Sequence, residues 1–495
     1  MTATTPVAPA PPAALSTAAD LDPTLIAQIA AGRAVAIEPG LLAQVRRNCA
    51  QARAVLRRGL PVYGVNTGMG ALSQVRLTEA EQLAHQRNLM QARATGGPPW
   101  LDAAEVRAIF AVRLRTFLSG DAGVSGQLCE RLAQFLAAGI VPAVPRTGCG
   151  CAGEIIPLAH AFGPLAGIGQ VLRSDGTCQP AADALHEHGL GTFALGPKEG
   201  IALLAGVPGV TGLSLLRQLA ALALMARMEA AAALSIIAVR ASRDPYQAAC
   251  ARGDDELGTV LGRLRQVVGE LAEPGTLQAP VSFRVAGQVL AHVHRAAAAQ
   301  AAVIGRALAG VTDSPAFLEG RFVGTAGFHG IGLAAGCDQL TAALAHAAEV
   351  SAARLHRLLD PSVTGLPAQL AARPGPDAGL VAVHKRAAGE VHALRRLATV
   401  TSVGLIETSG GQEDAQSFGW EAADTLRRAV QHADVITACE ALGAYQAIAL
   451  SGSPAPVSCR GLLTRLASII GPINADRPFG ADIQRLLETP WATPD

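Results

Sequence analysis

Tyrosine occurs at only three of the 495 positions in this chain, at Tyr63, Tyr246 and Tyr445. The first two lie in segments rich in Gly, Asn, Asp and Pro, which are typical of loops. A phenol can act as a general base when nearby positive charge or hydrogen-bond donors lower its pKa from about 10. Tyr63 and Tyr246 are therefore candidate acid–base residues. The alternative is that both are core tyrosines whose hydroxyls are hydrogen-bonded.

Two cysteines, Cys149 and Cys151, form a second candidate group. They come just before a helix that we expect to begin near Glu154. Helix N-termini favour anions and lower the pKa of a thiol from about 8.5. Cys151 is then a candidate nucleophile. The alternative is that both cysteines pack as small hydrophobic side chains.

Composition excludes several classes of partner. The net charge is +1, and no basic stripe with interleaved aromatic residues predicts nucleic-acid binding. The nine cysteines are scattered without zinc-finger spacing, and His186-x-His188 lacks a third ligand, so we expect no metal site. Scattered free thiols favour a reducing, cytoplasmic location.

These residues must be positioned by helices, because helical periodicity dominates the chain. The first 23 residues are rich in Ala, Pro and Thr and predict a disordered tail instead of a secretory signal. We expect a mostly α fold, with a helix-rich N-terminal region over 24–205 and a long-helix bundle with C-terminal helices over 206–495. Charges interrupt the apolar run 212–241, which favours a buried helix over a membrane span. Helices are predicted at 77–94, 103–117, 127–138, 212–241, 285–309, 331–359, 380–402 and 422–450, and short strands at 35–37, 62–65 and 171–173.

Several segments resemble the histidine and phenylalanine ammonia-lyase family, within the aromatic amino acid ammonia-lyase superfamily. Residues 150–160 (GCAGEIIPLAH) resemble its G-A-S-G-D-L-x-P-L-A-H stretch, and residues 63–70 (YGVNTGMG) resemble Y-G-x-N-T-G-F-G. The matches follow the family order from about residue 60 to 415. The other matching segments are 196–204 (GPKEGIALL), 243–246 (RDPY), 312–315 (TDSP), 326–330 (AGFHG) and 412–414 (QED).

The resemblance implies roles for individual residues. Tyr63 matches the tyrosine that removes the β-proton of the substrate, with Tyr246 as a partner donor. Phe328 matches the phenylalanine beside the electrophile, and Glu413 matches a glutamate of the pocket. Asn66 and Gly70 belong to the Tyr63 loop and are expected to help bind substrate. The resemblance also implies a homotetramer whose active sites combine residues from three subunits.

The chain departs from the family where the chemistry takes place. In the family, Ala-Ser-Gly cyclises and dehydrates to methylideneimidazolone, and the serine supplies the electrophilic methylene. Here the tripeptide is Cys151-Ala152-Gly153, and the Ala152 methyl has no leaving group, so this cofactor is not expected. Ala205, Ala249 and Gly327 replace the family's asparagine of L-L-N-G-T, its carboxylate-binding arginine and the asparagine of G-N-F-H-G.

Arg93 stands where the family often has histidine. Because arginine suits bidentate recognition of carboxylates, Arg93 is a candidate for a relocated substrate-anion site. The alternative is a surface arginine at the end of its helix.

Together these features favour an ammonia-lyase-like enzyme that works without methylideneimidazolone. Tyrosine acid–base chemistry would serve elimination, isomerisation or conjugate addition on a small acid or amine whose proton is already activated. One alternative is a catalytically inactive homologue that binds a ligand or supports an active paralogue. Another is a true ammonia-lyase with an unconventional cyclised group at residues 151–153. No membrane partner is expected.

Overall fold

The computed structural model describes residues 11–270 and 273–492, which form two compact units. Unit 1 comprises the described residues up to Leu216 together with Ala301–Cys337 and Thr401–Asp424. Unit 2 comprises Arg217–Gln300, Asp338–Val400 and the described residues from Thr425 onward. Each unit thus uses three separate stretches of sequence, whereas we expected two continuous regions with a boundary near residue 205. Local composition cannot show this, because four of the five boundaries fall inside a long helix.

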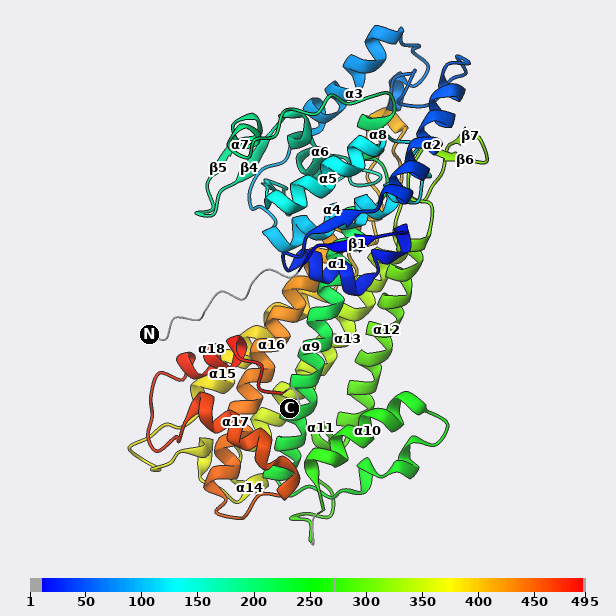
Figure 1. Cartoon of the computed structure of the whole chain (residues 1–495). Helices are drawn as coiled ribbons and strands as arrows, with labels where there is room; N and C mark the ends of the chain where they lie inside the picture. The colour runs from blue at the N-terminus through cyan, green and yellow to red at the C-terminus, as the bar shows by residue number, and fades with distance from the viewer. Residues whose placement is uncertain (1–10, 271–272, 493–495) are drawn as a thin grey trace. The chain divides into compact units, whose positions relative to one another are not determined.

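Unit 1 contains most of the short elements of the chain (Figure 1). Several of its helices begin at a side-chain N-cap. For example, Thr78 and Glu81 form a capping box before α3, which satisfies two otherwise unpaired backbone donors. The helices are α1 (Pro23–Ala30), α2 (Pro39–Leu56), α3 (Glu79–Arg93), α4 (Ala103–Leu118), α5 (Gly126–Ala138), α6 (Ile155–Phe162), α7 (Ala181–Glu187) and α8 (Glu199–Leu204).

The strands of unit 1 are few and short. β1 (Ala13–Leu15) pairs in parallel with β2 (Val35–Ile37). β3 (Val141–Pro142), β4 (Gln170–Leu172) and β5 (Cys178–Pro180) form an antiparallel sheet, and β6 (Ala316–Leu318) pairs with β7 (Arg321–Val323).

The predicted tail over residues 1–23 is only partly testable. Residues 1–10 lie outside the described residues. For residues 13–23 the prediction is wrong, because β1 pairs with β2 and buries Leu15. Asp22 also accepts a hydrogen bond from the Leu25 N–H at 2.7 Å and so caps α1.

Unit 2 contains α10 (Asp255–Val268), α11 (Val281–Arg284), α14 (Pro361–Thr364), α15 (Val381–Leu397), α17 (Arg460–Ile470) and α18 (Gly480–Glu488). Four of the five unit boundaries fall within α9 (Pro208–Ala238), α12 (Ala286–Ala309), α13 (Ile331–Leu358) and α16 (Gly419–Leu450), and the fifth follows α15. Within unit 2, Ser235 of α9, Arg354 of α13 and Glu440 of α16 are joined by hydrogen bonds, so these three helices lie side by side (Figure 1).

The eight helices predicted from periodicity are confirmed, with ends shifted by a few residues. The predicted strand at 62–65 is wrong. The Asn66 side chain accepts from the Val62 N–H and donates to the Leu60 carbonyl, both at 2.7 Å, and this folds the segment into turns. Local side-chain bonds of this kind compete with strand pairing.

One stretch, Glu199–Ala238, is long and apolar enough to cross a membrane by length and composition. In the structure, 72% of its most apolar window is buried within the protein. Core helices of folded proteins pass the same test, and the burial agrees with the core helix predicted over 212–241.

Candidate active site

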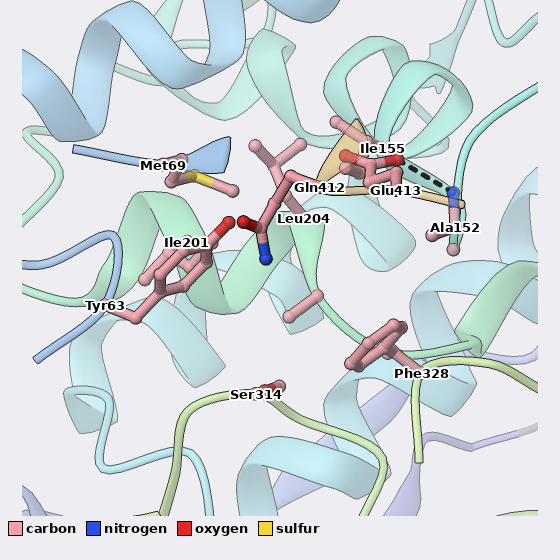
Figure 2. A pocket seen from close by; sticks show the side chains of 13 residues that line it. Tyr63, Met69, Ala152, Ile155, Ile201, Leu204, Ser314, Phe328, Gln412 and Glu413 are labelled. Atoms are coloured by element: carbon pink, nitrogen blue, oxygen red, sulfur yellow. Dashed lines mark hydrogen bonds between the residues drawn. The ribbon is translucent and has the colours of Figure 1, made fainter. Parts of the chain in front are cut away.

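A cavity of about 230 Å³ in unit 1 is lined by half of the predicted site residues. Figure 2 shows Tyr63, Phe328, Glu413 and Ala152 around this cavity. A more polar hollow of about 370 Å³ shares Tyr63, Glu413, Met69 and Ile155 with it. The two spaces are therefore adjoining parts of one site, one mainly apolar and one polar.

The Tyr63 loop is rigid because Asn66 holds it from within. Asn66 is 5% exposed, and its amide accepts from the Val62 N–H and donates to the Leu60 carbonyl. These bonds give Asn66 a structural role in its own loop, and its substrate-binding role stays a prediction. The Gly70 N–H donates to the Tyr63 hydroxyl at 2.8 Å, which fixes the position of the phenolic oxygen.

Glu413 connects the degenerate tripeptide to the site. Its carboxylate accepts hydrogen bonds from the Ala152 N–H at 3.0 Å and the Ser409 hydroxyl at 3.1 Å. Figure 2 shows the first of these bonds. On the other side of the loop, Glu154 accepts from the N–H groups of Gly209 and Val210, both at 2.6 Å. The loop is thus held on both sides by the side chains of glutamates, and burial raises the pKa of Glu154 to about 8.

Arg93, the last residue of α3, lines the polar hollow with Cys151 and Ser409. Among the described residues, its hydrogen-bond partner is the Met69 sulfur at 3.8 Å. Burial lowers the pKa of Arg93, while the negative charges of Tyr63 and Glu413 oppose that shift. A partly buried guanidinium with only a weak partner can receive a carboxylate from a ligand.

A buried ion pair fixes two walls of the apolar cavity. Lys198 donates to Asp313 at 2.6 Å, with side chains 1% and 0% exposed. Lys198 precedes α8, which supplies Ile201 and Leu204 to the cavity, and Asp313 precedes Ser314. Burial lowers the pKa of Lys198 and raises that of Asp313, and in each case the partner's charge opposes the shift.

The residues present do not fit a methylideneimidazolone. Formation of the group requires loss of a hydroxyl from the middle residue of the tripeptide, and Ala152 has none. The Ala152 side chain and Gly153 still line the cavity, and Phe328 lies beside Gly153. The cavity therefore contains the tripeptide but not the hydroxyl from which the electrophile would be made.

We expect the tryptic peptide Thr147–Arg173 to have the mass of its unmodified sequence in the native protein. The physical reason is that Ala152 offers no leaving group. Mass spectrometry of the peptide after thiol blocking in denaturant measures this. A peptide lighter by one water would show that the backbone at residues 151–153 cyclises and would contradict the expectation.

Unit 1 brings together most of the predicted site residues, whereas Tyr246 belongs to unit 2. Tyr246 lies in unit 2, is 1% exposed, and donates its hydroxyl to the Phe283 carbonyl at 2.8 Å. Burial raises the pKa of this phenol. Within unit 2, Tyr246 is thus a buried tyrosine with a hydrogen-bonded hydroxyl, and its role as a partner donor stays a prediction.

Several wall residues lie in the matched segments but were not predicted as site residues, namely Met69, Ile155, Ile201, Leu204, Ser314 and Gln412. Most are apolar and carry no chemical signature. Gln412 was detectable, because it directly precedes Glu413 in the matched QED segment. Within the described part of the chain, no group of three His, Cys, Asp or Glu residues is arranged to hold a metal ion.

The chain is similar in sequence and in fold to known lyases and aminomutases. The sequence pattern of the family described as aromatic amino acid lyase matches residues 21–467. Histidine ammonia-lyase of Streptomyces avermitilis is 34% identical over 441 residues, which cover 86% of this chain and 85% of the relative. The structure of tyrosine aminomutase from Streptomyces globisporus superposes with a TM-score of 0.90 at 27% identity and 97% coverage of each chain. Ergothionase from Treponema denticola, an ergothioneine-degrading enzyme, has the same fold, with a TM-score of 0.90 at 24% identity and coverage of 96% of this chain and 98% of that one.

Proposed function

The chain belongs to the aromatic amino acid lyase family, and from this membership we propose that it is an enzyme that eliminates a leaving group from a small carboxylic acid without methylideneimidazolone. Tyr63 is the general base and takes the β-proton. The observation that carries the proposal is the Tyr63 hydroxyl, which faces the cavity and accepts the Gly70 N–H at 2.8 Å. The same groups serve the reverse addition or an isomerisation.

The missing electrophile limits the substrate. In the family chemistry the electrophile activates an amino group that would otherwise be a poor leaving group. Without it, the leaving group must depart on its own, as a quaternary ammonium does when it leaves as a neutral tertiary amine. Phe328 and the Glu413 carboxylate line the same cavity, and an aromatic face with a carboxylate suits a quaternary cation. We therefore propose a substrate with a positively charged leaving group next to an acidic proton.

A substrate panel tests this function. The panel contains histidine and tyrosine, their N-trimethylated forms, and ergothioneine, which the Treponema denticola enzyme degrades. The assay follows the rise in ultraviolet absorbance from an α,β-unsaturated acid and the release of amine. Turnover of the trimethylated compounds but not of the primary amines is expected. Equal turnover of primary amines, or no turnover of any compound, would reject the proposal.

We expect replacement of Arg93 by alanine to weaken binding of a carboxylate ligand by about 10- to 100-fold, because a hydrogen bond to a charged group contributes roughly 1.5–3 kcal/mol. Isothermal titration calorimetry with the saturated acid analogue of the best substrate measures the affinity, and the melting temperature is expected to change little.

The matched control for this prediction is Arg87→Ala on the same helix. Arg87 donates to the Ala166 carbonyl at 3.1 Å and does not line the polar hollow. Its loss should leave affinity unchanged. Equal affinity of the Arg93 and Arg87 variants would show that Arg93 is only a surface arginine.

We further propose that the enzyme is a homotetramer, as the family resemblance implies. The loops that border the polar hollow carry exposed apolar side chains, including Leu72 at 65%, Leu405 at 67% and Ile406 at 64% exposure. Exposed apolar groups of this kind mark surfaces that a partner covers.

Light scattering at micromolar protein is therefore expected to give the mass of four chains. Replacement of Leu405 and Ile406 by serine should shift the protein toward smaller species. A wild-type monomer would contradict the proposal and its shared active sites.

A further inference from the structure

Cys149 and Cys151 bring two thiols together at the edge of the polar hollow. Their sulfur atoms are 3.4 Å apart, and both lie near the Gly153 carbonyl, at 3.6 Å and 3.3 Å. Both cysteines are free in the structure. Gly150 separates them and has open space where a side chain would be. The sulfurs would need to approach by only about 1.4 Å to reach disulfide bonding distance.

The two thiols have different environments. Cys149 is 3% exposed, whereas Cys151 lines the polar hollow. The Cys149 S–H and the backbone N–H groups of Ile155 and Ile156 at the start of α6 lower the pKa of Cys151 to about 7. The same pairing, together with burial, raises the pKa of Cys149 well above its usual range. The Cys151 thiol, which lines the hollow and ionises readily, is therefore in contact with the buried, protonated thiol of Cys149.

This arrangement exceeds what packing requires. A buried cysteine fills space as a small hydrophobic residue, but packing alone does not need a second sulfur in contact or a route to solvent. The proposed elimination by Tyr63 uses neither thiol. An accessible low-pKa thiol next to a second thiol is instead the arrangement of redox-sensitive cysteines.

We propose that Cys149 and Cys151 form a redox-active dithiol that hydrogen peroxide converts reversibly into an intrachain disulfide. The Cys151 thiolate attacks one peroxide oxygen, an S–O bond forms, the O–O bond breaks, and hydroxide leaves. Cys151 is then a sulfenic acid. The Cys149 sulfur displaces the sulfenic hydroxyl, and the Cys149 proton leaves with it as water. Two thiols and one peroxide thus yield one disulfide and two waters, and a dithiol reductant reverses the change.

Oxidation would also alter the site. The disulfide draws the Cys151 sulfur toward the buried Cys149 and removes a thiolate from the hollow that contains Arg93 and Glu413. The proposal does not depend on which reaction the enzyme catalyses, because it rests on the two sulfurs alone.

Mass spectrometry of the full-length protein tests the proposal. The protein is treated with equimolar hydrogen peroxide, blocked with N-ethylmaleimide in denaturant and digested with trypsin. We expect the peptide Thr147–Arg173 to carry no maleimide and to be lighter by two hydrogens, and to carry two maleimides after prior treatment with dithiothreitol. A peptide that keeps both maleimides after peroxide, or a disulfide from Cys151 to any other cysteine, would overturn the proposal.

Three variants sharpen the result. Cys149→Ser should stop at a Cys151 sulfenic acid that dimedone traps, and Cys151→Ser should leave Cys149 unoxidised because it is buried. Cys250→Ser is the matched control, since Cys250 is exposed and outside the peptide, and it should form the disulfide as the wild type does. Dimedone trapping at Cys149 in the Cys151→Ser variant would contradict the assigned order of attack.

Discussion

Replacement of Tyr63 by phenylalanine is expected to lower kcat/KM for the best substrate of the panel by about 10²–10⁴-fold, the usual contribution of a positioned general base. The change removes one oxygen atom that faces the cavity and accepts the Gly70 N–H. The loop that carries it is held by Asn66 through bonds to Val62 and Leu60, and these bonds remain. The melting temperature should therefore stay close to that of the wild type.

Tyr445→Phe provides the matched control, because it makes the same chemical change at a tyrosine of α16 in unit 2. Initial rates measured by ultraviolet absorbance, with circular dichroism melts of both variants, separate catalysis from folding. If Tyr63→Phe kept wild-type kcat/KM, or if both variants lost activity equally, Tyr63 would not be the base.

The long helices could be predicted from the sequence, but several short ones could not. Periodicity over α9, α13 and α16 extends across many turns and is unmistakable. In contrast, α8 has only 6 residues, fewer than two turns, and its position depends on the buried pair of Lys198 and Asp313. The partner in that pair is 115 residues away, so no local window contains the signal.

The candidate site, like the fold, could be predicted only in part from the sequence. The motifs placed Tyr63, Phe328, Glu413 and Ala152 together because each matched a segment with its own chemistry. The motifs could not show that the Asn66 amide forms hydrogen bonds to Val62 and Leu60 in its own loop, since these bonds depend on backbone geometry.

Gly327 is a second case of this kind. Gly327 stands where the family has asparagine, and from the sequence this difference suggested an altered substrate pocket. In the structure, a Cβ atom there would collide with the Val311 carbonyl, so the backbone itself excludes a side chain.

The largest effect on stability is expected from Glu440→Ala, which should reduce the free energy of unfolding by about 3–5 kcal/mol, because it leaves a buried arginine without its partner. Glu440 is fully buried in unit 2 and accepts from the Ser235 and Ser351 hydroxyls at 2.7 Å and 2.5 Å. Arg354, 3% exposed, donates to both carboxylate oxygens at 2.5 Å and 2.8 Å. The change thus removes four hydrogen bonds that join α9, α13 and α16. Urea denaturation followed by circular dichroism measures the loss.

The controls for this variant distinguish a buried pair from ion pairing in general. Glu349→Ala breaks an ion pair with Arg395 whose side chains are 35% and 64% exposed, and exposed pairs contribute only about 0–1 kcal/mol. The double variant Glu440→Leu with Arg354→Met should recover much of the lost stability, because a hydrophobic replacement of both partners avoids the unpaired charge. A double variant as unstable as Glu440→Ala would mean that the cost arises from the serine bonds and packing, and a Glu440→Ala loss no larger than that of Glu349→Ala would refute the assigned importance of this network.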